Sequence, residues 1–531
     1  MSVPDQHPLY RNPVLAADWP DPDAVRVGNE YYLVTSSFNR SPGLPVLHSR
    51  DLVNWDLLTH ALPAVPPADA FTLPRHGGGV WAPAIRFHDG TFHITYPDPD
   101  RGVSVVSATD PAGPWSAPRN LLPGLGIIDP CPFWDEDGSA WLVHGWARSR
   151  SGVKNRLTLV PVDPGLTRAT GPGTTVVDGE HVPGCHTLEG PKVHRRGGYY
   201  WIFAPAGGVA TGWQSVFRAR DVRGPYEHRI VMTRGGTTVN GPHQGAWIDT
   251  PHGTDWFLHF QDLGPVGRVV HLQPLRWAED GWPVIGDAAD AGTCGVPVAR
   301  HPTPHGTTQG SRYPGGDDDF TTPGADASGR PGPQWRWQAN PGRRWAQTGD
   351  GRLRLTALPN DTGNLRSLPQ VLGQPLPGID AVATTSLRLE GPDGARAGLT
   401  VLGRAYLWAG LARSGDRLVV VAAERSAGSF DETVREIAAV PAGTRLEVRL
   451  DVRAHAGSDE QDPVRVTVAL RWQQDQRWVT VLDAVRPEAG HWIGAELALF
   501  AAAPLGGAPG TAEFGPFRLD TALLAEPEDR P

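Results

Sequence analysis

The sequence predicts an all-β protein in which a five-bladed β-propeller is followed by a C-terminal β-sandwich. Two observations predict the propeller: a unit of roughly 50 to 60 residues recurs five times, and each copy joins two apolar or aromatic strands through a tight turn. A third observation predicts the sandwich, because strand-like runs recur over roughly the last 200 residues. The chain of 531 residues is also longer than one hydrophobic core usually supports.

Each copy of the repeat starts near a proline, continues as an apolar strand, turns, and resumes as an aromatic-rich strand. Glycine-containing turns between apolar strands are hairpin signals, and no long helical periodicity separates the copies. A sandwich of irregular hairpins is the alternative interpretation of the same pattern. The five turns fall at Gly28-Asn29, Asp89-Gly90, Asp137-Gly138, Gly197-Gly198 and His252-Gly253.

The composition changes between His301 and Asp319, where Pro, Gly, Thr and Asp replace the apolar runs. Such a segment cannot bury much apolar surface, so it is interpreted as a linker. The predicted domains are residues 1–305 for the propeller, 306–316 for the linker and 317–531 for the sandwich. Strand-like runs of the second domain include Leu353–Leu358, Arg417–Val421 and Val464–Leu470.

Composition excludes several function classes. The formal charge is −9 and no cluster of Lys or Arg stands out, so no nucleic-acid partner is expected. No apolar run reaches the length of a signal peptide or membrane span, which predicts a cytoplasmic protein without a membrane partner. Cys131, Cys185 and Cys294 are odd in number and lack metal-ligand spacing, so we expect free thiols in a reducing compartment. The oligomeric state is left open.

The first strand of each propeller blade lines the central axis, so the starts of the five copies should meet at one site. These starts carry Asp21, Trp81, Asp129, Glu189 and His243. Three carboxylates around one cavity repel one another, which a fold tolerates mainly where a site uses them. Asp-Pro pairs also open turns, and that is the competing interpretation of each acid taken singly. Two carboxylic acids in different environments suit the hydrolysis of a glycosidic bond.

Five motifs, in this order, resemble glycoside hydrolase family 43, the β-xylosidase and α-L-arabinofuranosidase family, over nearly the whole chain. The resemblance implies a concanavalin A-like fold for the C-terminal sandwich. It also implies a small oligosaccharide substrate, derived from xylan or arabinan, from which terminal xylose or arabinofuranose is released. The motifs are Asn12–Leu15 with Trp19–Asp23, Asp129-Pro130, Glu189-Gly190-Pro191, Gly267–Pro274 and Gly281–Gly286.

The resemblance implies catalytic roles for the three acids. Asp21 falls on the general base, Glu189 on the general acid, and Asp129 on the residue that tunes and orients the acid. The implied reaction inverts the anomeric centre, which requires the base and acid carboxyl groups to lie about 6.5 to 9.5 Å apart. Leu188 and Cys131 depart from the family pattern, where Thr and Ser are expected, and leave the sugar specificity open.

Other residues are candidates for substrate binding. Phe38 and Trp81 match family positions that wall the sugar pocket, although either ring could simply belong to the core. Arg268 matches an arginine that contacts sugar hydroxyls. His243 could orient a carboxylate or, through water, help to hold a metal ion on the propeller axis, although a lone His is more often a hydrogen-bonding residue. If a metal is bound, a structural Ca²⁺ fits these residues better than zinc does. No cofactor is expected to be required.

The second domain contains four tryptophans that invite a carbohydrate-binding interpretation, although core packing explains them as well: Trp335, Trp337, Trp345 and Trp408. Two rival functions stay open at this stage. One is a non-catalytic propeller that binds carbohydrate or another protein. The other is a five-bladed hydrolase of the fructosidase-like kind, which uses a nucleophilic carboxylate and retains the anomeric configuration.

Overall fold

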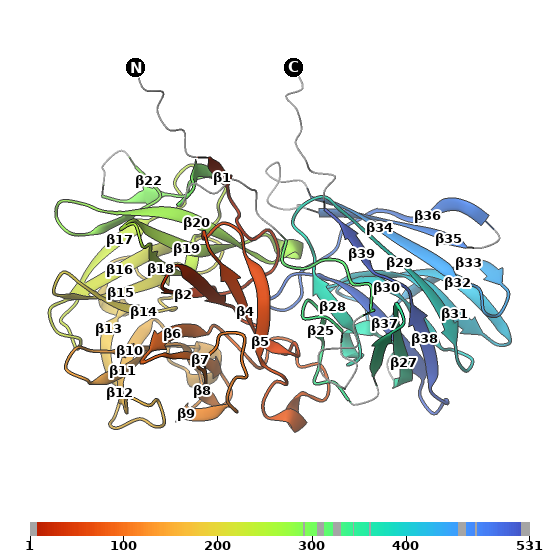
Figure 1. The fold of residues 1–531 in the computed structure, drawn as a ribbon, viewed down its shortest axis with the longest axis horizontal. Helices are drawn as coiled ribbons and strands as arrows, with labels where there is room; N and C mark the ends of the chain where they lie inside the picture. The colour runs from red at the N-terminus through yellow and green to blue at the C-terminus, as the bar shows by residue number, and fades with distance from the viewer. Residues whose placement is uncertain are drawn as a thin grey trace, which may run out of the picture.

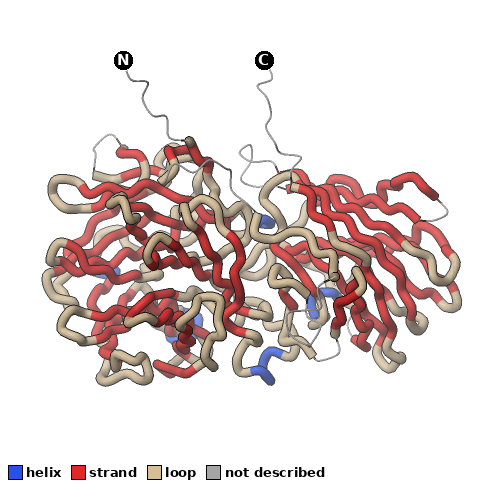
Figure 2. The backbone as a smooth tube through the Cα atoms, in the orientation of Figure 1, coloured by secondary structure: helices blue, strands red, loops and turns tan. Residues whose placement is uncertain are grey.

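The computed structural model describes residues 8–289, 293–304, 313–321, 331–342, 345–360, 363–454, 464–472 and 475–521. These residues form strands almost throughout (Figure 2), which confirms the predicted all-β class. Most of the predicted linker, residues 306–312, lies outside the described part of the chain. Among the described residues no helix has the length and apolar character needed to span a membrane. The short helices are α1 (Arg148–Ser151), η1 (Ala68–Phe71), η2 (Gly179–His181), η3 (Gly264–Val266) and η4 (Leu365–Ser367).

Five four-stranded antiparallel blades follow one another along the chain, and each predicted turn joins the first two strands of its blade. Blade 1 comprises β2 (Asp23–Val27), β3 (Glu30–Val34), β4 (Gly43–Ser49) and β5 (Asp56–Leu62). Blade 2 comprises β6 (Ala84–His88), β7 (Thr91–Asp98), β8 (Gly102–Ala108) and β9 (Arg119–Pro123). Blade 3 comprises β10 (Ile127–Trp134), β11 (Ala140–Trp146), β12 (Arg156–Val162) and β13 (Thr174–Asp178).

The last two blades complete the ring (Figure 1). First strands of neighbouring blades contact each other, as in the pairs β2 with β6, β6 with β10 and β18 with β2, so these strands surround the axis. Blade 4 comprises β14 (Lys192–Arg196), β15 (Tyr199–Ala206), β16 (Trp213–Ala219) and β17 (Glu227–Met232), extended by β23 (Gly295–Val296) and β22 (Asp287–Ala288). Blade 5 comprises β18 (His243–Asp249), β19 (Asp255–Asp262), β20 (Arg268–Trp277) and β21 (Pro283–Ile285).

The segment before blade 1 closes the ring by hydrogen-bonding to blade 5. β1 (Leu9–Arg11) pairs with β24 (Arg300–Pro302), and the N–H groups of Val14 and Leu15 both donate to the carbonyl of Val270 in β20. The N–H of Trp19 donates to the carbonyl of Arg268 at 3.0 Å. This closure places the residues just before β2 beside the start of β20.

The second domain is a β-sandwich, as predicted. Two sheets join through the parallel pair β27–β37 into one continuous array of 15 strands. One sheet contains β25 (Arg336–Trp337), β28 (Leu372–Pro375), β30 (Arg396–Leu402), β31 (Tyr406–Ser414), β32 (Arg417–Arg425), β33 (Thr433–Val440) and β37 (Glu496–Pro504). The other contains β26 (Ala346–Gly349), β27 (Arg352–Asn360), β29 (Ala381–Glu390), β34 (Leu446–Ala454), β35 (Val464–Trp472), β36 (Asp475–Val485), β38 (Gly510–Phe514) and β39 (Arg518–Asp520).

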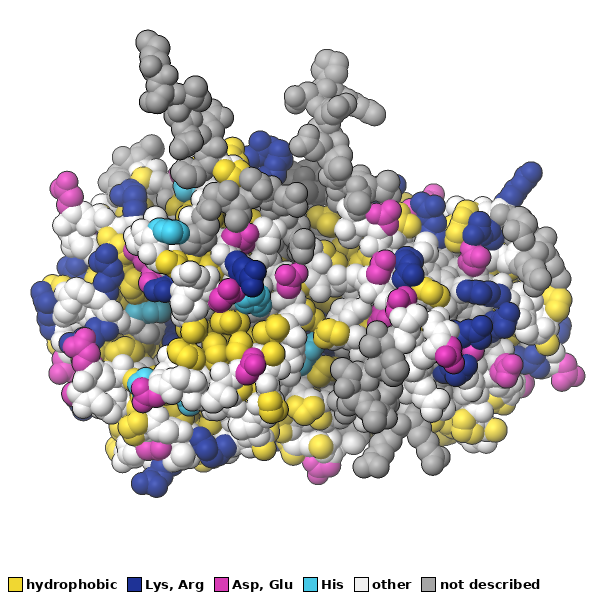
Figure 3. Space-filling view, in the orientation of Figure 1, with side chains coloured by type: hydrophobic (Ala, Val, Ile, Leu, Met, Phe, Trp, Pro, Cys, Tyr) yellow, Lys and Arg dark blue, Asp and Glu magenta, His cyan; other side chains and the backbone are white. Residues whose placement is uncertain are grey.

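The tryptophans of the sandwich serve mainly as core residues. Trp335, Trp337 and Trp408 are almost completely buried, and the partly exposed Trp345 packs against the core cluster that contains Trp335 and Trp337. The carbohydrate-binding interpretation of these rings is therefore not supported by their burial. On the outside, basic and acidic side chains are interspersed across the face drawn in Figure 3.

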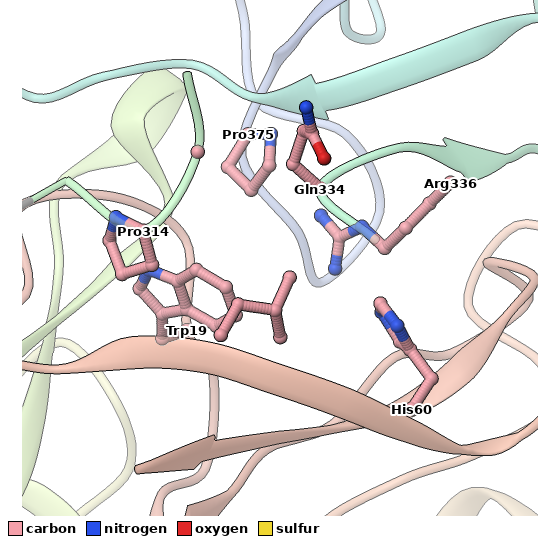
Figure 4. Close-up of a pocket in the computed structure, with 8 residues that line it drawn as sticks. Trp19, His60, Pro314, Gln334, Arg336 and Pro375 are labelled. Carbon is pink, nitrogen blue, oxygen red and sulfur yellow. The ribbon is translucent and has the colours of Figure 1, made fainter. Parts of the chain in front are cut away.

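A buried ion pair joins the propeller to the sandwich. Arg40, beyond β3, lies 2.7 Å from Glu496 at the start of β37, and Arg336 approaches the same carboxylate at 3.5 Å. A cavity of about 10 Å³ lies nearby between Trp19, His60 and Arg336 (Figure 4). Burial, assisted by the charge of Arg336, lowers the pKa of His60 to about 3, so this imidazole is neutral at physiological pH.

Candidate active site

Asp21 lies two residues before β2 and is 5% exposed. Both of its carboxylate oxygens are held: the Arg268 guanidinium donates to Oδ1 at 2.7 Å, and the Ser36 hydroxyl donates to Oδ2 at 2.5 Å. Burial lowers the pKa of the Arg268 guanidinium, but the surrounding carboxylates, Asp21 first, outweigh burial and raise this pKa above its ordinary value. The two contacts fix the orientation of Asp21, as a group that aligns a water molecule requires.

Asp129 lies inside β10, where the pairing with β11 shifts register between Ile128 and Cys131. Its side chain is buried, and the N–H of Gly190 donates to Oδ2 at 2.8 Å. Burial first, and then the negative charge of Glu189, raises the pKa of Asp129 to about 7. Asp129 therefore titrates near neutral pH, and its charge depends on the charge of Glu189.

Asp21 and Asp129 share the same unusual backbone conformation, with φ at 56° in both residues. Positive φ is uncommon outside glycine and costs on the order of 1–3 kcal/mol, so it persists where the surrounding structure enforces it. The two acids occupy comparable positions near the starts of blades 1 and 3. Strain of this kind clusters at functional sites, which agrees with a shared use of these positions.

Glu189 lies three residues before β14 and, at 25% side-chain exposure, is more accessible than Asp21 or Asp129. His243, the first residue of β18, places Nε2 3.2 Å from Glu189 Oε1, although the two atoms are not aligned as a hydrogen bond. Gly190 follows with φ at 60°, and a Cβ there would lie 3.0 to 3.1 Å from neighbouring side chains. Glycine is therefore required where the backbone reaches Asp129.

The two aromatic candidates lie side by side but differ in accessibility. The ring centroids of Phe38 and Trp81 are 6.3 Å apart in an edge-to-face arrangement. Phe38 is buried and pairs with Val80 through its backbone, as a core residue does. Trp81 is partly exposed, and its indole donates to the carbonyl of Gly77 at 2.9 Å. Of the two rings, Trp81 is the one with surface available to a sugar.

A loop of the sandwich walls the site. A cavity of about 310 Å³ lies between the propeller and this loop, and its lining includes Arg268, Arg404, His491 and Trp492. The Trp492 ring is 49% exposed, and its centroid lies 5.7 Å from the Arg268 guanidinium carbon. The imidazole of His491 packs so closely against Gly77 of the propeller that it fills the space a side chain at Gly77 would need. The site is therefore completed by both domains.

Sequence reasoning singled out the three acids as candidates but missed several of their neighbours. Ser36 lies two residues before Phe38, and its role as a donor to Asp21 emerges only from the fold. Lys192 is completely buried, donates to the carbonyl of Pro83 at 3.1 Å and favours the charged form of Asp129. Trp492 carries no sequence signal, because it lies in another domain and outside any repeat.

The described residues offer no clear set of ligands for a metal ion. Nowhere among them do three or more His, Cys, Asp or Glu side chains gather in a way that could hold a metal ion. Ca²⁺ prefers six to eight oxygen ligands, whereas His243 offers nitrogen and stands beside a single carboxylate. The axial Ca²⁺ ion stays a prediction, and no step of the chemistry is assigned to it.

Two family models match the chain. The model for glycosyl hydrolases family 43 matches residues 10–283, and the model for the β-xylosidase C-terminal concanavalin A-like domain matches residues 318–520. These matches cover both structural domains, so they agree with the propeller and the sandwich seen here.

The relatives are named for xylose- and arabinose-releasing enzymes. A putative β-xylosidase of Xylanibacter ruminicola is 39% identical over 410 residues, which cover 76% of this chain and 73% of the relative. A β-xylosidase of Formosa agariphila is 33% identical, covering 67% of this chain and 63% of the relative. A non-reducing-end α-L-arabinofuranosidase of Bacteroides ovatus is 32% identical, covering 52% and 53%. The chain thus spans about half to three quarters of these relatives.

Solved structures share the whole architecture. A xylan β-1,4-xylosidase of Bacillus halodurans superposes with a TM-score of 0.82, covering 96% of this chain and 100% of the other at 22% identity. At that level of identity the likeness concerns the fold.

Proposed function

Because the chain belongs to glycoside hydrolase family 43, we propose that it is an exo-acting enzyme that releases terminal xylose from xylan-derived oligosaccharides. The observation that carries this proposal is the meeting of Asp21, Asp129 and Glu189, whose charges act on one another or on the same neighbours. A binding-only propeller has no need of three acids so placed. Two relatives that cover 76% and 67% of this chain are named a putative β-xylosidase and a β-xylosidase.

The proposed reaction is a single displacement with inversion. Asp21, oriented by Ser36 and Arg268, takes a proton from a water molecule as the water oxygen bonds to the anomeric carbon. The bond from that carbon to the leaving oxygen breaks, and Glu189 gives this oxygen its proton. The carboxylate of Asp129 accepts a hydrogen bond from the N–H of Gly190, and so lies beside Glu189 and interacts with it electrostatically.

Exo action is supported by the wall that the sandwich contributes. His491 and Trp492 limit the space beyond Arg268, so the cavity suits the end of a chain rather than a chain passing through. Glu189 is the most exposed of the three acids, which suits a group that protonates a leaving oxygen at the mouth of the pocket.

Arabinofuranose is the second candidate for the released sugar. Relatives of comparable identity include the α-L-arabinofuranosidase from Bacteroides ovatus and a xylosidase/arabinosidase of Humicola insolens, 31% identical over 304 residues. A cytoplasmic location also stays a prediction, which cell fractionation would test.

The test compares hydrolysis of aryl β-D-xylopyranoside and aryl α-L-arabinofuranoside by the wild type and by Asp21→Ala and Glu189→Ala. We expect both variants to lose at least about 100-fold in kcat/KM, while Asp89→Ala, at an exposed turn, stays near the wild type. Glu189→Ala should lose less on an activated dinitrophenyl glycoside than on xylobiose, since a good leaving group needs little protonation. Proton NMR should show α-xylose forming first, and β-xylose forming first would contradict inversion.

A further inference from the structure

The proposed general acid lies on a stretch of chain without regular secondary structure. Residues 182–191, which the structure describes throughout, form neither helix nor strand between η2 and β14, and are called the acid segment below. The direction of Glu189 therefore depends on what holds the backbone around it. Three consecutive N–H groups are held: that of Leu188 donates to Asn155 Oδ1 at 2.9 Å, that of Glu189 to the carbonyl of Pro205 at 3.2 Å, and that of Gly190 to Asp129 Oδ2 at 2.8 Å.

The side chain of Asn155 is buried and directed at the acid segment. Asn155 is 3% exposed and immediately precedes β12 of blade 3. Besides accepting from Leu188, its amide donates to the carbonyl of Cys185 and to the carboxylate of Glu180, both at 3.3 Å. Its main-chain carbonyl accepts from the N–H of Gly179 at 2.8 Å. Asn155 thus holds η2, the middle of the acid segment and the residue just before the acid.

The backbone around Asn155 is shaped for these contacts. Asn155 has φ at 58°, a left-handed conformation that asparagine tolerates better than most residues. A Cβ on Gly179 would lie 2.5 to 2.6 Å from the side-chain amide, so the amide fills the space beside this glycine. Thr187 has φ at 52°. A non-glycine residue keeps such a conformation where its neighbours enforce it, and the bonds from Asn155 to Cys185 and Leu188 lie on either side of Thr187.

Blade 3 holds the acid from both sides. Asp129 accepts from the N–H of Gly190, which follows Glu189, and Asn155 accepts from the N–H of Leu188, which precedes it. The Leu188 side chain is 1% exposed and packs in an apolar core that residues of blades 3 and 4 share. Displacement of the three residues that carry the acid would therefore break a contact with blade 3.

We propose that Asn155 is a positioning residue of the general acid, which aims the carboxyl group of Glu189 at the leaving oxygen by fixing the N–H of Leu188. This role rests on the proposed function, since it requires Glu189 to give up a proton. Proton transfer depends on direction, and a misplacement of about 1 Å can cost ~100-fold in rate. Asn155 acts through the backbone of the acid segment, so its loss should impair proton transfer rather than binding of the terminal sugar.

The experiment measures kcat and KM of the full chain on two xylosides that differ in their need for protonation. The leaving group of xylobiose must be protonated, whereas dinitrophenolate leaves without a proton. We expect Asn155→Ala to lose about 10- to 30-fold in kcat on xylobiose, part of the roughly 10²–10⁴-fold that a general acid contributes. On dinitrophenyl β-D-xylopyranoside the loss in kcat should stay below about threefold, and KM should stay within about twofold on both substrates.

Two control variants separate positioning from loss of stability. Asn12→Ala removes a side chain that makes three hydrogen bonds, at 2.8 to 2.9 Å, with backbone groups of Leu272 and Val298. We expect it to lower the melting temperature as Asn155→Ala does, while the ratio of kcat on the two xylosides stays within about twofold of the wild type. Glu180→Ala, at an exposed position, removes one partner of Asn155 but leaves its bonds to the acid segment, so it should also keep this ratio.

A second variant displaces the amide of Asn155 without removing it, and replaces Asn155→Ala if that variant does not fold. Gly179→Ala forces the amide to shift, so it should lower the kcat ratio of xylobiose to the dinitrophenyl xyloside by about three- to tenfold. Equal losses on the two xylosides, or no loss on either, would overturn the positioning role. Failure of the wild type to cleave either xyloside would instead count against the proposed function.

Discussion

Asp129 is the residue whose ionisation the fold alters most clearly within the site. Its folded-state pKa is about 7, compared with an ordinary value of 3.8. Between these values the folded protein holds a proton that the unfolded chain has released. The contribution of Asp129 to the free energy of unfolding therefore falls as the pH rises from about 4 to about 7. At neutral pH and above, the buried carboxylate of Asp129 therefore lowers the free energy of unfolding, while its charge responds to that of Glu189.

The variant Asp129→Asn tests this trade. Asparagine can still accept the hydrogen bond from Gly190 but never carries the buried charge, so we expect a higher melting temperature than the wild type at pH 8 and a smaller gain at pH 4.5. Activity should fall by at least about 100-fold at both pH values. Calorimetry at the two pH values checks the prediction, and an equal gain at both would contradict the raised pKa.

At the scale of strands and loops, the hairpins could be predicted because each is encoded locally. Gly28-Asn29 lies directly between Val27 of β2 and Glu30 of β3, and Asp137-Gly138 lies in the short turn between Trp134 of β10 and Ala140 of β11. The convergence of the blade starts followed from propeller geometry alone. By contrast, the Trp492 loop reaches the site through packing between domains, and no local pattern in the chain reports such a contact.

The segment that closes the ring makes a prediction at the same scale. Asp18 accepts a hydrogen bond from the N–H of Arg268 at 2.8 Å and another from the N–H of Gly494, and burial raises its pKa to about 6. Asp18→Ala leaves both buried donors without a partner, so we expect a loss of about 2–3 kcal/mol in the free energy of unfolding. Urea denaturation measures this loss, and Glu279→Ala, at an exposed turn, should stay within about 0.5 kcal/mol of the wild type. A loss no larger than that of the control would show that Asp18 is dispensable.

At the scale of the whole molecule, the two domains meet over buried charges as well as apolar surface. Glu496 lies three residues after Ile493 of the wall loop and is held by Arg40 of the propeller and Arg336 of the sandwich. The carboxylate thus fixes the start of β37 against the propeller. Its pairing could not be predicted, because 456 residues separate Arg40 from Glu496 in sequence.

Glu496→Gln should therefore affect both stability and substrate binding. The two arginines lose their counter-charge in a buried site, which costs on the order of 3–5 kcal/mol, and the Trp492 wall loses its support. We expect a lower melting temperature and a raised KM with a smaller change in kcat. Glu513→Gln removes a more exposed partner of Arg352 and should cost less than about 1 kcal/mol. A KM unchanged from the wild type would show that the ion pairs of Glu496 do not support substrate binding.

The closure of the ring through its first residues has a consequence for synthesis of the protein. A ribosome makes Asp21 early, but the arginine that orients it emerges 247 residues later, and the loop bearing Trp492 later still. A nascent chain with four finished blades holds all three acids and yet lacks the partner of its base. Hydrolytic activity should therefore arise only near the end of translation, as one late event rather than blade by blade.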